Sequence, residues 1–404
     1  KQKPNIILFL IDDLGWKDLG CQGSTFYQTP NIDRLAKEGV RFTDAYAACA
    51  VCSPTRAAIL TGKYPARLLL TDWLPSGRWE PKAKLREGRF LRGLPVEEIT
   101  LAEALREGGY RTANIGKWHL GFNTGGKKKD FDFDQAFIGG PINRGFDSYF
   151  GIHSSPGAFP LFYLKDRKAM AKPSEKTSWV KMKIEGATTT IHGLKSPDFE
   201  LDEASPTFCQ RAVELIRNHA DSNSDQPFFL YYASPIPHSP WVPSKAFKGK
   251  SGHGDYGDFV MQLDDIVGQI NQALKDTGLD QNTLLIFTSD NGGAGYIGLP
   301  DINQPYRGWK LTHFEGGTHV PFMAKWPQKI EPNSRLTDPV HHIDLFHTIA
   351  AAAGATTPDN VKYDGVDLIP HVRGEASSKP HETLFWREGH HQSVLHNGWK
   401  LIRA

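Results

Sequence analysis

This 404-residue sequence has few cysteines, no long early apolar run and no large excess of charge of either sign. Its four cysteines are too few for a disulfide scaffold. The longest early apolar run, residues 6–11, cannot span a bilayer and follows no secretion signal, so we expect no membrane span and, if the protein is exported, a mature form. The 47 basic and 45 acidic residues nearly balance, which argues against nucleic acid as a partner.

Acceptors for N-linked glycosylation are also absent, because no asparagine is followed two residues later by serine or threonine. This absence favours a bacterial over a lysosomal setting. The remaining composition, 39% hydrophobic and 23% charged residues, is that of a folded globular protein and excludes disordered, collagen-like and coiled-coil chains.

Short apolar runs alternate with helix-like segments along most of the chain. We expect strands at residues 5–11, 111–115, 228–233 and 284–288, and helices at residues 29–39, 100–108, 205–216, 256–278 and 344–354. Strands that are apolar on both faces and separated by helices predict an α/β fold with a mostly parallel sheet covered on both sides. Residues 121–205 lack periodicity and predict surface excursions, whereas Asn397-Gly398 predicts a hairpin between residues 393–395 and 399–402.

Charged and polar side chains follow four of the expected strands, at the sheet edge where ligands bind in parallel sheets. They are Asp12-Asp13, Asp290-Asn291, Lys117 with His119, and His238. Adjacent carboxylates are costly to bury unless a cation joins them, and three carboxylates with an amide oxygen suit Ca²⁺ or Mg²⁺. Taken alone, each acidic pair is better explained as a solvated loop or a helix cap.

Cys52 begins a second group, Cys-Ser-Pro-Thr-Arg at residues 52–56. Ser53 is expected to be the N-cap of a helix and Pro54 its first-turn residue, so Cys52 should lie at the positive end of that helix, where an anion is favoured. This placement suits a nucleophile that faces an anionic ester. The alternatives are a small buried hydrophobe, or a redox or half-zinc pair with Cys49.

Several motifs together resemble the type I sulfatase family of the alkaline phosphatase superfamily. They are Cys-x-Pro-x-Arg at residues 52–56, Gly-Lys-Trp-His-Leu-Gly at residues 116–121, and Lys310 five residues before Glu-Gly-Gly at residues 315–317. Further matches at residues 5–7, 12–13, 144–147, 237–238 and 289–292 follow the family's order over nearly the whole chain.

The resemblance implies an alkaline-phosphatase-like fold, in which helices sandwich a large mixed, mostly parallel sheet. Residues 1–375 would form the catalytic α/β domain. Residues 376–404 would form the beginning of a small antiparallel subdomain, and we expect the rest of that subdomain beyond Ala404. The resemblance also implies an exported enzyme, periplasmic or secreted.

The resemblance implies a role for each matching motif position of this sequence. Cys52 would be oxidised to formylglycine by a formylglycine-generating or anaerobic maturase enzyme, and a hydroxyl of the hydrated aldehyde would attack sulfur. Ca²⁺, with Mg²⁺ as the alternative, would be held by Asp12, Asp13, Cys52, Asp290 and Asn291. Arg56 would fix the formylglycine, while Lys117 and Lys310 would neutralise sulfate oxygens. His119 would act as base and His238 as the acid for the leaving oxygen.

Three positions put parts of the pattern in question. Thr55 stands where serine is commoner in the family, but it keeps a small hydroxyl, so we expect modification to survive. His319 stands where arginine is frequent after Glu-Gly-Gly. Cys49 could form a disulfide with an unmodified Cys52, which would abolish activity.

Aromatic and basic residues near these motifs are candidates for substrate binding. They are Trp73, Arg78, Trp241, His313, Trp386, Arg387 and His390. Because indole faces pack on sugar rings, they favour a sulfated glycan, of the galactose or N-acetylgalactosamine type or another, although about half of the tryptophans should belong to the core.

Two other functions remain open at this point. Relatives in the superfamily use the same nucleophile and metal on phosphorus esters, so the protein could be a phosphodiesterase or phosphonate monoester hydrolase. A homologue that binds glycans but is catalytically silent is the other alternative.

Overall fold

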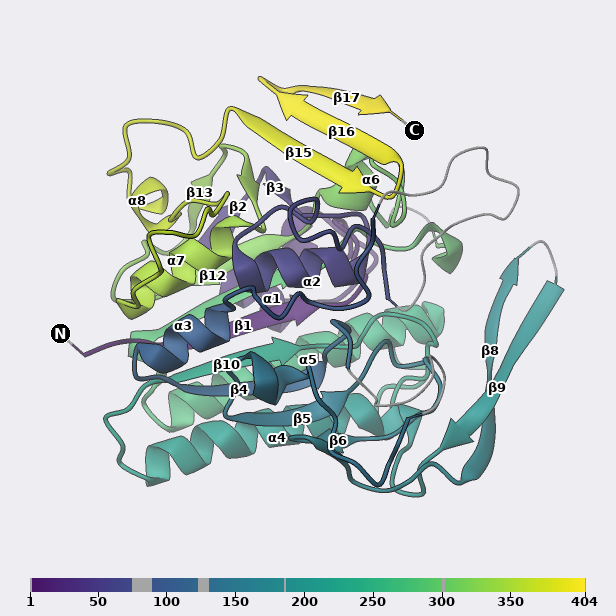
Figure 1. The fold of residues 1–404 in the computed structure, drawn as a ribbon. Helices are drawn as coiled ribbons and strands as arrows, with labels where there is room; N and C mark the ends of the chain where they lie inside the picture. The colour runs from purple at the N-terminus through teal and green to yellow at the C-terminus, as the bar shows by residue number, and fades with distance from the viewer. Residues whose placement is uncertain (1, 75–88, 123–130, 185–186, 300–301, 404) are drawn as a thin grey trace.

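The computed structural model describes residues 2–74, 89–122, 131–184, 187–299 and 302–403. Within these residues a ten-stranded sheet crosses the molecule in the order β13-β2-β12-β11-β1-β10-β4-β5-β6-β7 (Figure 1). Its strands are β1 (Asn5–Ile11), β2 (Val40–Phe42), β4 (Arg111–Lys117), β5 (Ser148–Ile152), β6 (Leu164–Lys165), β7 (Lys168–Ala169), β10 (Phe228–Ala233), β11 (Thr283–Ser289), β12 (Phe322–Lys325) and β13 (Ser334–Leu336).

The centre of the sheet is parallel, as the buried apolar strands predict. Strands β11, β1, β10, β4 and β5 run in one direction, and β12 and β6 pair antiparallel with the two ends of this group. The sheet is therefore large, mixed and mostly parallel, which confirms the predicted fold class.

Helices cover both faces of the sheet (Figure 1). On one side lie α1 (Pro30–Lys37), α4 (Leu201–Asp221) and α5 (Gly254–Asp276); on the other lie α2 (Cys52–Thr61), α3 (Leu101–Glu107) and α7 (Asp344–Ala353). Strand β1 serves both layers because its side chains alternate. Ile6 and Leu8 belong to the core under α2, α3 and α7, whereas Ile7 and Phe9 belong to the core under α1, α4 and α5.

The shorter elements connect these layers. They are β3 (Ala45–Tyr46), β14 (Val340–His341), α6 (Glu315–Thr318), α8 (Ile369–Val372) and the single-turn 3-10 helices η1 (Gly20–Gln22), η2 (Pro141–Arg144), η3 (Asp280–Asn282) and η4 (Gly295–Ile297). No described helix is both long and apolar enough to cross a bilayer.

The predicted start of α4 is wrong. Ser205-Pro206 is expected to open the helix, because proline is favoured in the first turn. The helix instead begins at Leu201 and contains Pro206. Since proline has no N–H, the helix lacks one backbone hydrogen bond at this point. The acidic residues Asp202 and Glu203 in the first turn favour the earlier start.

The prediction for residues 121–205 is also incomplete. Strand β5 is a largely buried member of the main sheet, although its few residues show no clear periodicity in the sequence. Strands β8 (Glu175–Ile184) and β9 (Ala187–Lys195) form a separate antiparallel hairpin that stands away from the body of the molecule (Figure 1).

The C-terminal residues form a small antiparallel sheet. The expected hairpin is present as β16 (His391–His396) and β17 (Trp399–Arg403), and β15 (Thr383–Glu388) adds a third strand. Leu384, Trp386 and Leu395 of this sheet pack on Tyr46. The sheet therefore rests on the segment that leads to α2.

Candidate active site

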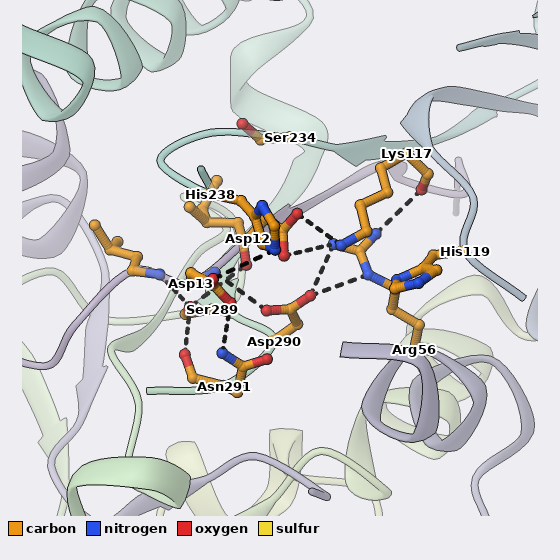
Figure 2. A network of polar contacts seen from close by, with 12 residues as sticks. Asp12, Asp13, Arg56, Lys117, His119, Ser234, His238, Ser289, Asp290 and Asn291 are labelled. Atoms are coloured by element: carbon orange, nitrogen blue, oxygen red, sulfur yellow. Dashed lines mark hydrogen bonds and ion pairs between the residues drawn. The ribbon is translucent and has the colours of Figure 1, made fainter. Parts of the chain in front are cut away.

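The carboxyl ends of four neighbouring strands meet at one edge of the main sheet. Ile11 of β1 pairs with Ser289 of β11, and Ala233 of β10 pairs with Gly116 of β4. The residues that follow these strands therefore gather, and Figure 2 shows their charged side chains facing one another. The convergence expected from the sequence is present.

Each of the three carboxylates has a buried cationic partner. The Nζ atom of Lys117 donates to Oδ2 of Asp12 at 2.7 Å. Lys310 donates to Oδ2 of Asp13 at the same distance of 2.7 Å. Arg56 donates to Oδ2 of Asp290 from Nε at 3.0 Å and from Nη2 at 2.8 Å. All six side chains are almost completely buried, so water screens these charges little.

The backbone around this cluster adopts costly conformations. Asp13, His119 and Leu311 have positive φ angles of 67°, 58° and 79°, in the left-handed region that side chains disfavour. At Gly116 (φ 109°) a Cβ atom would lie 2.0 Å from the carbonyl oxygen of Ala233, so only glycine fits. Strain of this kind persists only where packing enforces it, and it is concentrated at functional sites.

Cys52 is the first residue of α2, and the predicted N-cap is wrong. The N-cap is Val51, and the hydroxyls of the next residues serve other segments. Ser53 Oγ accepts the backbone N–H of Leu74 at 3.1 Å. Thr55 Oγ1 accepts the N–H of Cys49 at 3.0 Å and donates to its carbonyl at 3.1 Å, so this threonine holds the turn that leads into the helix.

Burial shapes the reactivity of the Cys52 thiol. It raises the pKa of Cys52 to about 12, while Lys117 and Lys310 act in the opposite direction. The unmodified thiol is therefore protonated at neutral pH and a poor nucleophile. None of the four cysteines forms a disulfide, and Sγ of Cys49 lies 3.6 Å from Oε2 of Glu388.

A cation site is outlined beside Cys52. Asp12, Asp13, Cys52 and His238 each offer an atom within 4.8 Å of the others. Oδ1 of Asp12 and Oδ1 of Asn291 are buried without a hydrogen-bond partner. Buried oxygen atoms are rarely left unpaired, so these two atoms fit a hard cation. Asp290 lies at the edge of this group, with one oxygen turned to Arg56.

The two ends of the acidic cluster differ in pKa. Burial and the charge of Asp12 raise the pKa of Asp290 to about 7. At Asp12 burial is outweighed by Lys117, His238 and Arg56, which together hold its pKa below the usual range. The cluster therefore does not easily carry all its negative charges without a further cation.

The hydrogen bond of His119 defines which ring nitrogen carries its proton. Its Nε2 lies 2.6 Å from the carbonyl oxygen of Leu74, so this nitrogen carries the proton. Nδ1 is then the acceptor, and it has no hydrogen-bond partner in the structure. Burial and the charge of Lys117 lower the pKa of His119, so the ring is neutral at physiological pH.

His238 faces the acidic cluster from the loop after β10. Its Nδ1 donates to the carbonyl oxygen of Ser239 at 2.5 Å, and its Nε2 lies 3.6 Å from Oδ2 of Asp13. Burial and Lys310 lower the pKa of His238 to about 4. The ring is therefore neutral at pH 7.

The candidate substrate-binding residues are dispersed. Trp73 and Trp241 are half-buried, and Arg387 and His390 are exposed at the end of β15 and in the turn after it. His313 is buried, with Nδ1 at 3.1 Å from Ser393 Oγ. Arg78 lies outside the described residues.

Trp386 does not belong to a substrate rim. Only 3% of its surface is exposed, and its indole N–H donates to the carbonyl oxygen of Ala47 at 2.8 Å. Its ring packs against Tyr46 and His341. The expectation of an exposed Trp386 is wrong because successive side chains of β15 point to opposite faces of the strand. Trp386 points inward together with Leu384. His319 is likewise enclosed, by Trp16, Tyr46 and Tyr306.

Sequence reasoning missed two residues near the site. Ser289 ties the two acidic strand ends together, because its Oγ accepts the N–H of Leu14 at 2.9 Å and donates to the carbonyl of Asn291 at 2.8 Å. Tyr296 packs against Trp241 with ring centroids 6.3 Å apart. The structural role of Ser289 could have been inferred from its place beside Asp290. No motif in the sequence points to Tyr296.

Comparison with known proteins gives a consistent result. The family model described as Sulfatase matches residues 4–355. The steryl-sulfatase of Mus musculus is 34% identical over 458 residues, covering 99% of this chain and 70% of the relative. The N-acetylgalactosamine-6-sulfatase of Homo sapiens is 35% identical over 396 residues, covering 96% and 69%.

A solved structure adds the fold to this comparison. It comes from work on the metabolism of multiple glycosaminoglycans by Bacteroides thetaiotaomicron and superposes with a TM-score of 0.82 at 30% identity, covering 100% of this chain and 88% of the other. The protein therefore belongs to the sulfatase family, the enzymes that hydrolyse sulfate esters.

Proposed function

We propose that this sulfatase acts on a sulfated carbohydrate, with formylglycine derived from Cys52 as nucleophile and Ca²⁺ as the bound metal. One observation carries the assignment of the nucleophile. Cys52 begins α2, and its sulfur lies within 4.8 Å of ligand atoms of Asp12, Asp13 and His238. The helix N-terminus favours an anion at this point.

The cations of the site would bind and orient the sulfate group. Lys117 and Lys310 already contact the two strand-end carboxylates and would offer their remaining N–H groups to sulfate oxygens. Arg56 is fixed by Asp290 and by the carbonyl of Lys117, to which its Nη1 donates at 3.1 Å. It would therefore hold the side chain at position 52 rather than follow the substrate.

The two histidines would move protons. His119 presents an unpartnered Nδ1 and is neutral, which suits a base acting at the hydroxyl of the modified residue 52. His238 would donate to the leaving oxygen from Nε2. It needs a proton for this role, and the negative charge of a bound sulfate would raise its pKa.

The donor set suits a divalent metal. Asp12, Asp13, Asp290 and Asn291, together with residue 52, would hold Ca²⁺, and Mg²⁺ would be the alternative. The unpaired oxygens of Asp12 and Asn291 support this assignment. When bound, the ion would polarise the sulfate ester and favour the ionised nucleophile.

The carbohydrate substrate rests on two kinds of support. The human relative is named an N-acetylgalactosamine-6-sulfatase, and the superposed structure comes from work on glycosaminoglycan metabolism. Half-buried Trp73 and Trp241 offer indole rings near the site. Because sulfated glycans are polymers that do not cross membranes, we also propose a periplasmic or secreted enzyme that a formylglycine-generating or anaerobic maturase enzyme has processed.

The experiment joins mass spectrometry to a substrate screen. Protein from the native host should show the mass change of thiol-to-aldehyde oxidation in the peptide containing Cys52. It should release inorganic sulfate from sulfated galactose, N-acetylgalactosamine, glucosamine or fucose saccharides. Cys52→Ala should abolish release, whereas the matched variant Cys21→Ala should not.

Four outcomes would contradict parts of the proposal. Sulfate release by Cys52→Ala would reject the nucleophile, and a steryl sulfate preferred over every saccharide would reject the carbohydrate. Faster hydrolysis of phosphodiesters or phosphonate monoesters than of nitrophenyl sulfate would favour a phosphorus-ester hydrolase. Binding of a sulfated sugar with an unmodified Cys52 and no turnover would favour a silent glycan-binding protein.

A further inference from the structure

A cavity of about 510 Å³ lies beside the His238 loop. Residues of the β8–β9 hairpin form one part of its lining, and the loop from Ser239 to Val242 forms another. The first turns of α4 and α5 contribute the remaining walls. Among the residues given a role above, Trp241 also lines this cavity.

The cavity adjoins the active site at Ser239, the residue that follows His238. Ser239 lines it, and the carbonyl oxygen of the same residue accepts the Nδ1 proton of His238. If His238 protonates the leaving oxygen, the sugar that carries this oxygen lies on the His238 side of the site. A second sugar attached to it would then pass Ser239 and reach the cavity.

Two tryptophans give the cavity an aromatic lining. Trp179 of β8 and Trp241 are both half-buried and both line it. Their rings are held in place because their indole N–H groups donate to the carbonyl oxygens of Gly157 at 3.0 Å and Pro237 at 3.1 Å. Fixed aromatic rings bind a sugar ring with little loss of side-chain entropy.

The charge of the lining is opposite to that of the catalytic cations. Glu200, Asp202 and Asp255 line the cavity, and Lys195 is its one described basic residue. Lys195 forms ion pairs with Glu175 and Glu200. The N-termini of α4 and α5 would by themselves attract an anion. The acidic residues in their first turns already provide that negative charge. The lining therefore repels anions and offers carboxylate oxygens to hydroxyl groups.

We propose that this cavity binds an uncharged sugar unit linked to the sulfated one, so that the enzyme prefers sulfated oligosaccharides whose neighbouring unit is neither sulfated nor a uronic acid. This inference rests on the proposed function, because it takes His238 to face the leaving oxygen. It defines a second subsite, formed by Trp179 and the acidic first turns of α4 and α5.

The subsite can be tested by comparing kcat/KM for two substrates. The quantity is kcat/KM for a neutral disaccharide sulfate divided by kcat/KM for the monosaccharide sulfate with the same sulfated unit. Trp179→Ala should lower this ratio about tenfold, the loss expected when one buried aromatic contact is removed. The matched control is Trp399→Ala, an 84% exposed tryptophan of the C-terminal sheet, which should leave the ratio unchanged. An unchanged ratio in Trp179→Ala would overturn the proposal.

Binding tests the subsite without any turnover. Saturation-transfer NMR would compare an unsulfated disaccharide of galactose and N-acetylgalactosamine with one in which glucuronic acid replaces galactose. The neutral disaccharide should bind to the wild type and not to Trp179→Ala. Asp202→Asn with Asp255→Asn should allow the uronic acid disaccharide to bind. Binding of the acidic disaccharide by the wild type, or of neither disaccharide, would overturn the proposal. Neutral binding with no sulfate release would instead count against the proposed function alone.

Discussion

Single residues at the active site depend on partners that are remote in sequence. His119 has a defined tautomer because the carbonyl of Leu74 accepts its Nε2 proton, and Leu74 is in turn held by Ser53 Oγ. The orientation of His119 therefore depends on the first turn of α2, although this residue follows β4. Sequence motifs name such residues, but they cannot give the tautomer, because the partner is a backbone oxygen.

The tautomer of His119 leads to a first prediction. His119→Ala should lower kcat by about 10²–10⁴-fold if the unpartnered Nδ1 is the base, as proposed. The mass of the peptide containing residue 52 should stay that of the modified wild type. His396→Ala, at an exposed position of β16, is the control and should keep full activity. A variant at position 119 with near-normal kcat would rule out this role.

A second prediction concerns Asp18, a buried carboxyl near the acidic cluster. Its Oδ2 accepts the N–H of Gly15 at 2.8 Å and the hydroxyl of Tyr256 at 2.5 Å, while its Oδ1 has no hydrogen-bond partner. Burial raises the pKa of Asp18 to about 7. The folded state therefore binds this proton more tightly than the unfolded state. Its contribution to stability is present at low pH and is lost as the pH rises to about 7.

The difference in melting temperature between the wild type and Asp18→Asn should show this dependence. Asparagine keeps an acceptor for both donors but does not titrate. From pH 5 to pH 7 the wild type should lose about 1.4 kcal/mol per pH unit relative to the variant, and above pH 8 the difference should stay constant. Differential scanning calorimetry between pH 5 and pH 9 measures it. Parallel curves for the two proteins would show that the carboxyl does not titrate in this window.

The helices differ in how clearly the sequence marks their ends. Helix α3 was predicted closely, because Thr100 and Glu103 form a complete capping box: Thr100 Oγ1 accepts the N–H of Glu103 and Glu103 Oε2 accepts the N–H of Thr100. Helix α4 has no side-chain cap at Glu200, so the proline was mistaken for its start. Local signals are reliable when both partners lie within one turn.

The capping box gives a third prediction. Thr100→Ala should lower the free energy of unfolding by about 1–2 kcal/mol, since it removes the cap and the hydrogen bond from Thr100 Oγ1 to the carbonyl of Arg144 at 2.8 Å. Thr100→Ser keeps both groups and serves as the matched control. Urea denaturation should give a lower midpoint for the alanine variant only. Equal midpoints for alanine and serine would mean that the box contributes nothing measurable.

At the scale of the whole molecule, the parallel sheet brings the site together. Asp12 and Asp290 are far apart in the sequence. They lie close together in the fold because β1 and β11 are neighbours in the sheet. This part could be predicted, since apolar strands and the polar residues that follow them are visible in sequence. Three features could not be predicted, because they depend on packing between distant segments. They are the inward orientation of Trp386, the β8–β9 hairpin and the contacts of Tyr296.

The convergence also predicts a metal-dependent stability. Saturating Ca²⁺ should raise the melting temperature of the chelator-treated protein, because the ion binds the folded state alone; a hundredfold excess over Kd corresponds to about 2.7 kcal/mol. Asn291→Ala, which removes one unpaired oxygen, should reduce this rise. Asn333→Ala, at a surface turn, should not. A calcium effect equal in all three proteins would place the ion elsewhere.

Helix α2 has an implication for how the enzyme is made. Every residue from Cys52 to Thr61 is buried, and Cys52 itself is 2% exposed. No other enzyme can reach its sulfur once the chain has assumed its final shape. Oxidation to the aldehyde, if it takes place, must therefore occur on a nascent or still unfolded chain. Protein that folds with the thiol intact would then keep an unmodified Cys52.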